Sequence, residues 1–312
     1  MLLGVAVYAT FALYAGISTM RESLSTFRWS SLAIALALSS TNYLIRFLKW
    51  QYYLARLEVV GVPVFDSLLV FLSGFVLTVT PGKVGEVFKS AVLSKTHGVP
   101  VARTAPVVVA ERLTDVIGVV ALIVLGSSAF TGGSVWALAG SAAVGLGLVL
   151  ILWERPARHV FGILEARGGR LGRLVPKFSE AYGSLRVVAG PSALLFPAAL
   201  STLAWACEGL AMWVILNGFD ANISLPRALF FYSTATLAGA LVPVPGGLGI
   251  VEGMIREQLV RIGQIGMGTA TAAMILIRFA TLWWAVVVGF GALFLLRLKY
   301  PNQLGAAREL ES

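Results

Sequence analysis

Charged residues and cysteine are both scarce in this sequence. Only 12% of its 312 residues are charged, whereas a soluble domain carries about 25%. Cys207 is the single cysteine, which excludes a disulfide framework and a thiolate metal cluster. The two histidines, His97 and His159, have no ligand partners at a useful spacing, so we expect both on the solvated surface and predict no metal or other cofactor. A phosphate loop of the form G-x-x-x-x-G-K-[ST] is also missing, which argues against direct ATP drive.

Long apolar runs take the place of charge. Hydrophobic residues make up 58% of the chain, and the mean hydropathy is +0.85. A helix needs about 20 apolar residues to cross ~30 Å of hydrocarbon. The first run lacks a basic segment and a small-residue cleavage site, so we interpret it as a retained helix. We predict an all-α polytopic membrane protein, a single transmembrane domain over 1–312 with about six crossing helices, at 1–20, 29–54, 104–125, 135–153, 192–216 and 268–296.

Two further apolar stretches are too short to cross. Residues 66–79 are followed by TPGKVGE (80–86), and residues 227–242 are followed by PVPGGLGIVEG (243–253). A helix that enters the bilayer, breaks and returns has this pattern. We therefore predict re-entrant helical hairpins at 66–96 and 227–262; two ordinary spans with proline kinks are the alternative. The helix-breaking residues would be Pro81, Pro243 and Pro245.

The distribution of basic residues predicts the topology. The net charge is +9, and residues 154–190 hold seven Arg and Lys against three Glu. Basic loops of membrane proteins stay in the cytoplasm, and no aromatic-interleaved basic platform indicates nucleic acid as a partner. We expect an inner-membrane protein with both termini and the 154–190 loop in the cytoplasm. The first hairpin then enters from the cytoplasmic side and the second from the opposite side.

The two hairpins also look like copies of one unit. Pro81-Gly82-Lys83-Val84-Gly85 aligns with Pro245-Gly246-Gly247-Leu248-Gly249, and an acid follows each, Glu86 and Glu252. Arg112 stands 31 positions after Pro81, and Arg278 stands 33 after Pro245. Repeat one would cover about 29–125 and repeat two about 191–297, with the linking span 135–153 inverting the second. Inverted repeats with broken helices are typical of secondary transporters.

Ionisable residues inside apolar spans are costly, so they are the candidate site residues. Helix N-terminal amides and glycines after each break suit an anion, although the glycines also fit plain turn geometry. One interpretation is a polar midplane cavity in which arginines hold a lipid phosphate and carboxylates move protons; the other is a set of structural ion pairs. Arg46 and Lys49 are expected to extend to the interface. The headgroup-binding candidates are Lys83, Arg112, Arg278, Gly82, Gly85, Gly246, Gly247 and Gly249, and the proton-coupling or ion-pair candidates are Glu86, Glu111, Asp115, Glu208 and Glu252.

TPGKVGE, ERLTD at 111–115 and VPVPGGLGIVEG together carry a family resemblance. The chain resembles the lysylphosphatidylglycerol synthase transmembrane region, or flippase-like domain family, over nearly its whole length. The resemblance implies kinship with the membrane half of the multiple-peptide-resistance proteins, which moves aminoacylated phosphatidylglycerol between leaflets. Other relatives are associated with polyprenyl- or dolichol-linked sugars and with hopanoids. Its motifs match Pro81, Gly82, Gly85, Glu86, Glu111, Arg112, Asp115, Pro245, Gly246, Gly249 and Glu252.

Our leading hypothesis is a lipid flippase or scramblase-like transporter for an anionic or aminoacylated phospholipid, or a polyprenyl-phosphate-linked lipid. The bifunctional relatives carry a soluble aminoacyl-transferase domain after the membrane region, whereas this sequence ends at Ser312, so no catalytic residue and no stand-alone synthase is expected. An integral-membrane lipid or glycosyl transferase is one alternative, but its acid-rich metal-dependent loop does not match the basic loop here. The other is a non-transporting subunit that partners a lipid-synthesising enzyme.

Overall fold

The chain folds into helices, and we describe it from a computed structural model. The structure describes residues 17–80, 87–127, 190–242 and 244–304, together with scattered positions within 8–13, 135–146 and 183–188. Every regular element in these ranges is helical, which confirms the all-α prediction. Within the described residues, three helical segments are long and apolar enough to cross a membrane: Trp29–Arg56, Ala193–Gly218 and Met267–Lys299.

The remaining predicted crossings fare differently. Helix α6 (Val101–Ser127) has 27 residues, which is length enough, but Glu111, Arg112 and Asp115 interrupt its apolar sequence. The predicted spans at 1–20 and 135–153 lie largely outside the described residues. From the first of these, the structure describes the short helix α2 (Ile17–Ser25). The number of crossings therefore stays a prediction.

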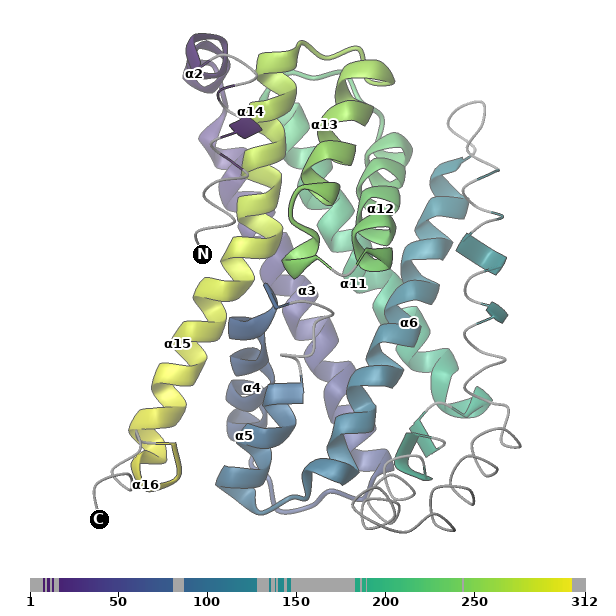
Figure 1. Cartoon of the computed structure of the whole chain (residues 1–312), viewed down its shortest axis with the longest axis vertical. Coiled ribbons are helices and arrows are strands. Elements are labelled where there is room, and N and C mark those ends of the chain that lie inside the picture. Colours follow the sequence, from purple (N-terminus) through teal and green to yellow (C-terminus); the bar gives the residue numbers. More distant parts are fainter. Residues whose placement is uncertain are drawn as a thin grey trace, which may run out of the picture.

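Helices α3 (Trp29–Arg56) and α11 (Pro191–Gly218) pack together at the centre of the molecule, and α6 packs against α11 (Figure 1). Gly118 of α6 faces the backbone of Ser201, which a Cβ on that glycine would meet at 2.8 Å. Gly126 likewise faces the carbonyl oxygen of Pro226, which a Cβ on that glycine would meet at 2.6 Å. Small residues allow this close approach of helix backbones, so the positions of α11 and α12 relative to α6 depend on these glycines.

Two helical hairpins stand at opposite ends of the molecule. Helices α4 (Val64–Ser73) and α5 (Phe88–His97) occupy one half, and α12 (Leu225–Leu241) and α13 (Ile250–Arg261) occupy the other (Figure 1). Short 3-10 turns, η1 (Gly74–Leu77) and η3 (Pro245–Gly247), follow α4 and α12. A Cβ on Gly246 would lie 3.5 Å from Cγ1 of Val79. The broken ends of the two hairpins therefore meet near mid-height.

The last long helix connects the two halves. It consists of α14 (Met267–Arg278), a π-helical turn η4 (Phe279–Trp283) and α15 (Trp284–Lys299), followed by the short α16 (Pro301–Leu304). Helix α14 lies beside α13, and α15 runs along α4. Apolar side chains form one core in each half, around Met212, Phe231 and Ile277 in one and around Trp50, Phe71 and Leu93 in the other.

A polar cluster fastens the base of the first hairpin to the end of α15. The buried Asp66 carboxylate accepts a hydrogen bond from the Tyr300 hydroxyl at 2.6 Å, and Lys299 pairs with its other oxygen. The bond to Asp66 raises the pKa of Tyr300 to about 12, because the phenol must stay protonated to donate it. His97 Nε2 lies 3.6 Å from Asp66 Oδ2 with only 10% of its side chain exposed. The prediction that His97 is a solvated surface residue was therefore wrong, while His159 lies outside the described residues.

Substituting Tyr300→Phe should lower the thermal midpoint of the purified protein in detergent. The change removes a donor from a buried carboxylate, which costs about 1–3 kcal/mol. Tyr52→Phe is the matched control, because the Tyr52 hydroxyl accepts only an exposed bond from Arg56. Equal midpoints for the two variants would contradict a stabilising role for the cluster.

Candidate functional site

A layer of buried charge separates the two apolar cores. At its centre is Lys49 of α3, whose side chain is fully buried. Its ammonium donates to Asp115 Oδ1 at 2.7 Å, to Ser201 Oγ at 2.8 Å and to Thr114 Oγ1 at 3.3 Å. The prediction that Lys49 extends to the interface was wrong. Lys49 instead links its own helix, α3, to α6 and α11, which carry its three partners.

Asp115 is shared by three cations. Besides Lys49, Arg112 contacts its Oδ2 at 3.0 Å and Arg46 contacts the same oxygen at 3.5 Å. Arg46 is 13% exposed in its side chain, so it too is largely buried and does not reach the interface as predicted. Arg46, Lys49, Arg112 and Asp115 thus form one cluster, in which three cationic side chains meet at a single carboxylate.

Glu111, one turn before Asp115, belongs to a separate pair. It binds Lys89 of α5, and both side chains are at least 96% buried. The Lys89 ammonium also lies 4.5 Å from the ring centroid of Trp50 and 5.2 Å from that of Phe71, a cation–π arrangement. The structure therefore buries Lys89 at a cation–π contact. The pair attaches the return helix of the first hairpin to α6.

In the other half, Arg278 and Glu252 form a buried ion pair. Arg278 Nε donates to Glu252 Oε1 at 2.6 Å, and a terminal nitrogen of Arg278 donates to the Gly246 carbonyl at 2.9 Å. Glu252 is one of the predicted proton-coupling or ion-pair candidates, and so is Glu208. Glu208, the other, accepts a hydrogen bond from the Tyr232 hydroxyl at 3.1 Å.

The glycines after the second break serve the turn itself. Gly246, Gly247 and Gly249 have φ angles of +61°, +67° and +85°, a region that residues with a Cβ rarely adopt. The Gly249 amide donates to Glu252 Oε2 at 2.7 Å. The Gly247 amide donates to the Val244 carbonyl at 3.1 Å, within the same turn. These positive φ angles and contacts fit plain turn geometry. Lys83, Pro81, Gly82, Gly85, Glu86 and Pro243 lie outside the described residues.

Two adjoining cavities lie between the hairpins. The first, of about 90 Å³, is the polar cavity, and its lining includes Asn42, Tyr43, Arg46, Glu208, Tyr232 and Arg278. The second, of about 320 Å³, is the apolar cavity, where Arg112 and Asp115 stand at one side of a wall formed by Val116, Val119, Leu237, Leu241, Val242 and Val244. Trp205, Thr236, Gly239, Ala240, Gly246 and Gly247 line both.

The structure thus brings together part of the predicted site. Arg112, Arg278, Glu208, Asp115, Gly246 and Gly247 line the two cavities, whereas Glu111, Glu252 and Gly249 are not among the lining residues. Sequence reasoning missed Arg46, Lys49 and Trp205. Asn42, Arg46, Lys49 and Tyr53 follow one another at four, three and four positions. This is the spacing of one helix face, and it could have identified a polar stripe on α3.

Removing Asp115 should destabilise the protein more than removing Lys49. Asp115→Asn removes the one carboxylate that pairs with the fully buried Lys49 and that Arg46 and Arg112 also contact, and breaking a buried ion pair costs about 3–5 kcal/mol. Lys49→Met leaves Asp115 with Arg46 and Arg112, so its cost should be smaller. Thermal unfolding in detergent measures both, with the exposed Glu257→Gln as control. A larger loss for Lys49→Met would contradict the shared role of Asp115.

Two comparisons agree with this architecture. A relative in Methanocaldococcus jannaschii, the UPF0104 membrane protein MJ1078, is 22% identical over 222 residues, covering 69% of this chain and 91% of that protein. The family described as the lysylphosphatidylglycerol synthase TM region matches residues 1–289, a range that contains both hairpins, both arginines and the cavities between them. The chain therefore belongs to the lysylphosphatidylglycerol synthase transmembrane-region family.

Proposed function

We propose that this protein is a lipid flippase or scramblase-like transporter, in which an anionic headgroup crosses through the cavities between the two hairpins. The observation that carries the proposal is the cluster of Arg46, Lys49, Arg112 and Asp115, because it places one guanidinium group at the wall of each cavity. Membership of a family of lipid-related membrane proteins supports the same class of substrate.

The energetics of the cluster favour an anionic ligand. A lone charge in the bilayer core costs several kcal/mol, so a phosphate that crosses needs cations close to its path. Arg46 and Arg112 line the two cavities, and guanidinium groups bind phosphate oxygens in paired geometry. The headgroup would in turn exchange its hydration shell for the arginines, the Thr236 hydroxyl and the Tyr43 hydroxyl that line the cavities.

The arrangement of hairpins supports a path from either side. We propose that α4–α5 and α12–α13 are re-entrant hairpins of an inverted repeat, the first open to the cytoplasm and the second to the opposite side, with both termini cytoplasmic in the inner membrane. Their broken ends meet at Val79 and Gly246, and the two cavities lie beside this contact. Broken helices at a repeat interface are where secondary transporters bind their substrates.

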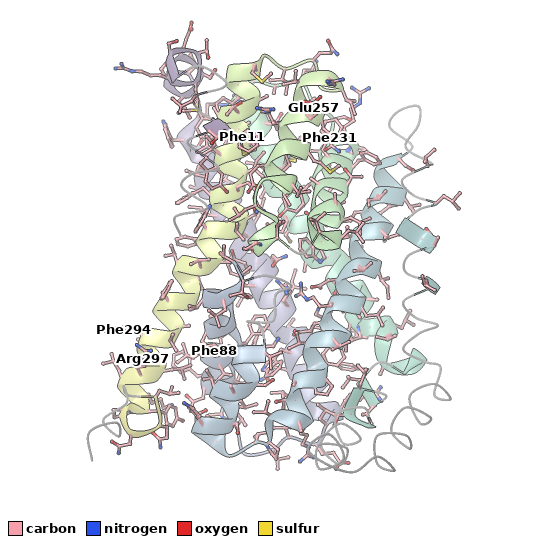
Figure 2. All side chains as sticks on the ribbon, in the orientation of Figure 1. Phe11, Phe88, Phe231, Glu257, Phe294 and Arg297 are labelled. Atoms are coloured by element: carbon pink, nitrogen blue, oxygen red, sulfur yellow. The ribbon has the colours of Figure 1, made fainter. Side chains whose placement is uncertain are left out.

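Reconstitution in vesicles tests the proposal. The wild-type protein should accelerate leaflet exchange of a fluorescent phosphatidylglycerol over protein-free vesicles. Arg112→Gln should lower that rate by about tenfold or more, because it removes a cation that would contact the phosphate in transit. The matched control is Arg297→Gln, since Arg297 stands near the far end of α15, away from the charged layer (Figure 2).

Two outcomes would refute it. The proposal fails if wild-type exchange equals that of empty vesicles for phosphatidylglycerol, aminoacylated phosphatidylglycerol and polyprenyl phosphate alike. It fails equally if Arg112→Gln, shown to be folded by its melting transition, exchanges lipid as fast as Arg297→Gln. Product formation from a sugar or aminoacyl donor without exchange would instead favour the transferase alternative.

A further inference from the structure

Trp205 of α11 divides the two cavities. It is one of the residues that line both, and its ring lies 6.4 Å from that of Tyr232 on the polar side. Its indole Nε1 is buried and has no hydrogen-bond partner among the described residues. A buried donor without an acceptor costs about 1–3 kcal/mol. This N–H is therefore placed to donate to a ligand.

The two sides of Trp205 differ sharply in chemistry. On the polar side, Asn42 Oδ1 and the Tyr43 hydroxyl are also buried without a hydrogen-bond partner in the described part of the chain, and Glu208 and Arg278 share their cavity. On the apolar side, six of the lining residues are Val or Leu. A ligand that matched both sides would be polar at one end and hydrocarbon at the other.

Positive charge stands on the boundary between the cavities. Arg46 lines the polar cavity and Arg112 lines the apolar one, yet both contact the same oxygen of Asp115. An anion that reached both arginines would therefore lie at the level of Trp205. In an amphiphile the charged phosphate occupies the corresponding place, between the polar headgroup and the acyl chain.

The apolar cavity reaches the outer surface of the helix bundle. Leu241 and Val242 line it at the end of α12, and they are 72% and 39% exposed. At the N-terminal end of α12, Pro226 and Phe230 pack directly on Gly126 of α6. Helices α6 and α12 are therefore in contact at one end, and the apolar cavity opens beside the other end of α12. A hydrocarbon chain could leave the cavity there and join the surrounding lipid.

We propose that an anionic lipid lies across the two cavities, with its headgroup in the polar cavity, its phosphate against Arg46, Arg112 and the Trp205 N–H, and an acyl chain in the apolar cavity. The chain leaves the protein between α6 and the end of α12. This inference rests on the proposed function and makes it specific: the ligand is a chain-bearing phosphate, not a soluble anion, and Trp205 sets its position.

Photolabelling of the full-length protein tests this placement. Phosphatidylcholine vesicles would contain a trace of phosphatidic acid with a diazirine near the end of one chain, and mass spectrometry would locate the adducts. We expect adducts on the segments 112–119 and 237–244. A diacylglycerol with the same chains but no phosphate should label these segments about tenfold less, because it lacks the group that the arginines bind.

Three variants separate the parts of the proposal. Val242→Trp fills the apolar cavity from its exposed rim and should reduce labelling by about tenfold. Val109→Trp is its control, since Val109 lies on α6, is 44% exposed and lines neither cavity. Trp205→Phe keeps the ring but removes the N–H, so it should narrow the preference for phosphatidic acid over diacylglycerol several-fold.

The outcomes separate this inference from the proposed function. Adducts spread evenly over exposed helix faces, equal labelling by the two lipids, or a Trp205→Phe variant with unchanged preference would each overturn the placement. Specific adducts without leaflet exchange would overturn transport and leave the lipid site standing. If Val242→Trp exchanges lipid between leaflets as fast as the wild type, and photolabelling gives no specific adducts, the lipid site is overturned and transport stands.

Discussion

The contacts of one carboxylate, Asp115, organise the middle of this protein. Lys49, Arg46 and Arg112 converge on it from α3 and α6, and Ser201 of α11 donates to it at 3.0 Å. Three helices are thus fixed to one another by a group that could not be buried alone. The same contacts hold Arg46 and Arg112 at the walls of the two cavities. The interaction that holds the helices together therefore also positions the two guanidinium groups.

The sequence predicted the helical class, the broken apolar stretches and the buried arginines, because each of these is a local signal. Fifteen or so apolar residues that end at Pro and Gly indicate a helix too short to cross. An arginine within AMILIRFATLWW stands out because an apolar span rarely holds a charge. Contact with Glu252 then followed from the turn at 246–249, whose left-handed glycines bring that acid toward α14.

Local signals could not show whether a polar side chain points toward the membrane surface or toward a facing helix. Lys49 and Arg46 occur near the end of an apolar span, where a long basic side chain commonly extends to the headgroups. Whether it does so depends on what the facing helices offer. Here Asp115, Thr114 and Ser201 stand opposite α3, and those residues are 65 or more positions away in the chain. His97 was misplaced for the same reason, since Asp66 and Tyr300 come from distant segments.

The long helix from Met267 to Lys299 has a mechanical consequence. It is joined to the turn of the second hairpin through Arg278, Glu252 and Gly246, and to the base of the first through Lys299, Tyr300 and Asp66. Gly289 adds a backbone contact, since a Cβ there would lie 2.7 Å from the Val76 amide. One long helix thus contacts both hairpins, and its regular α-helical hydrogen bonding is interrupted by the π-helical turn directly after Arg278. A tilt of this helix would therefore move the two halves of the molecule together.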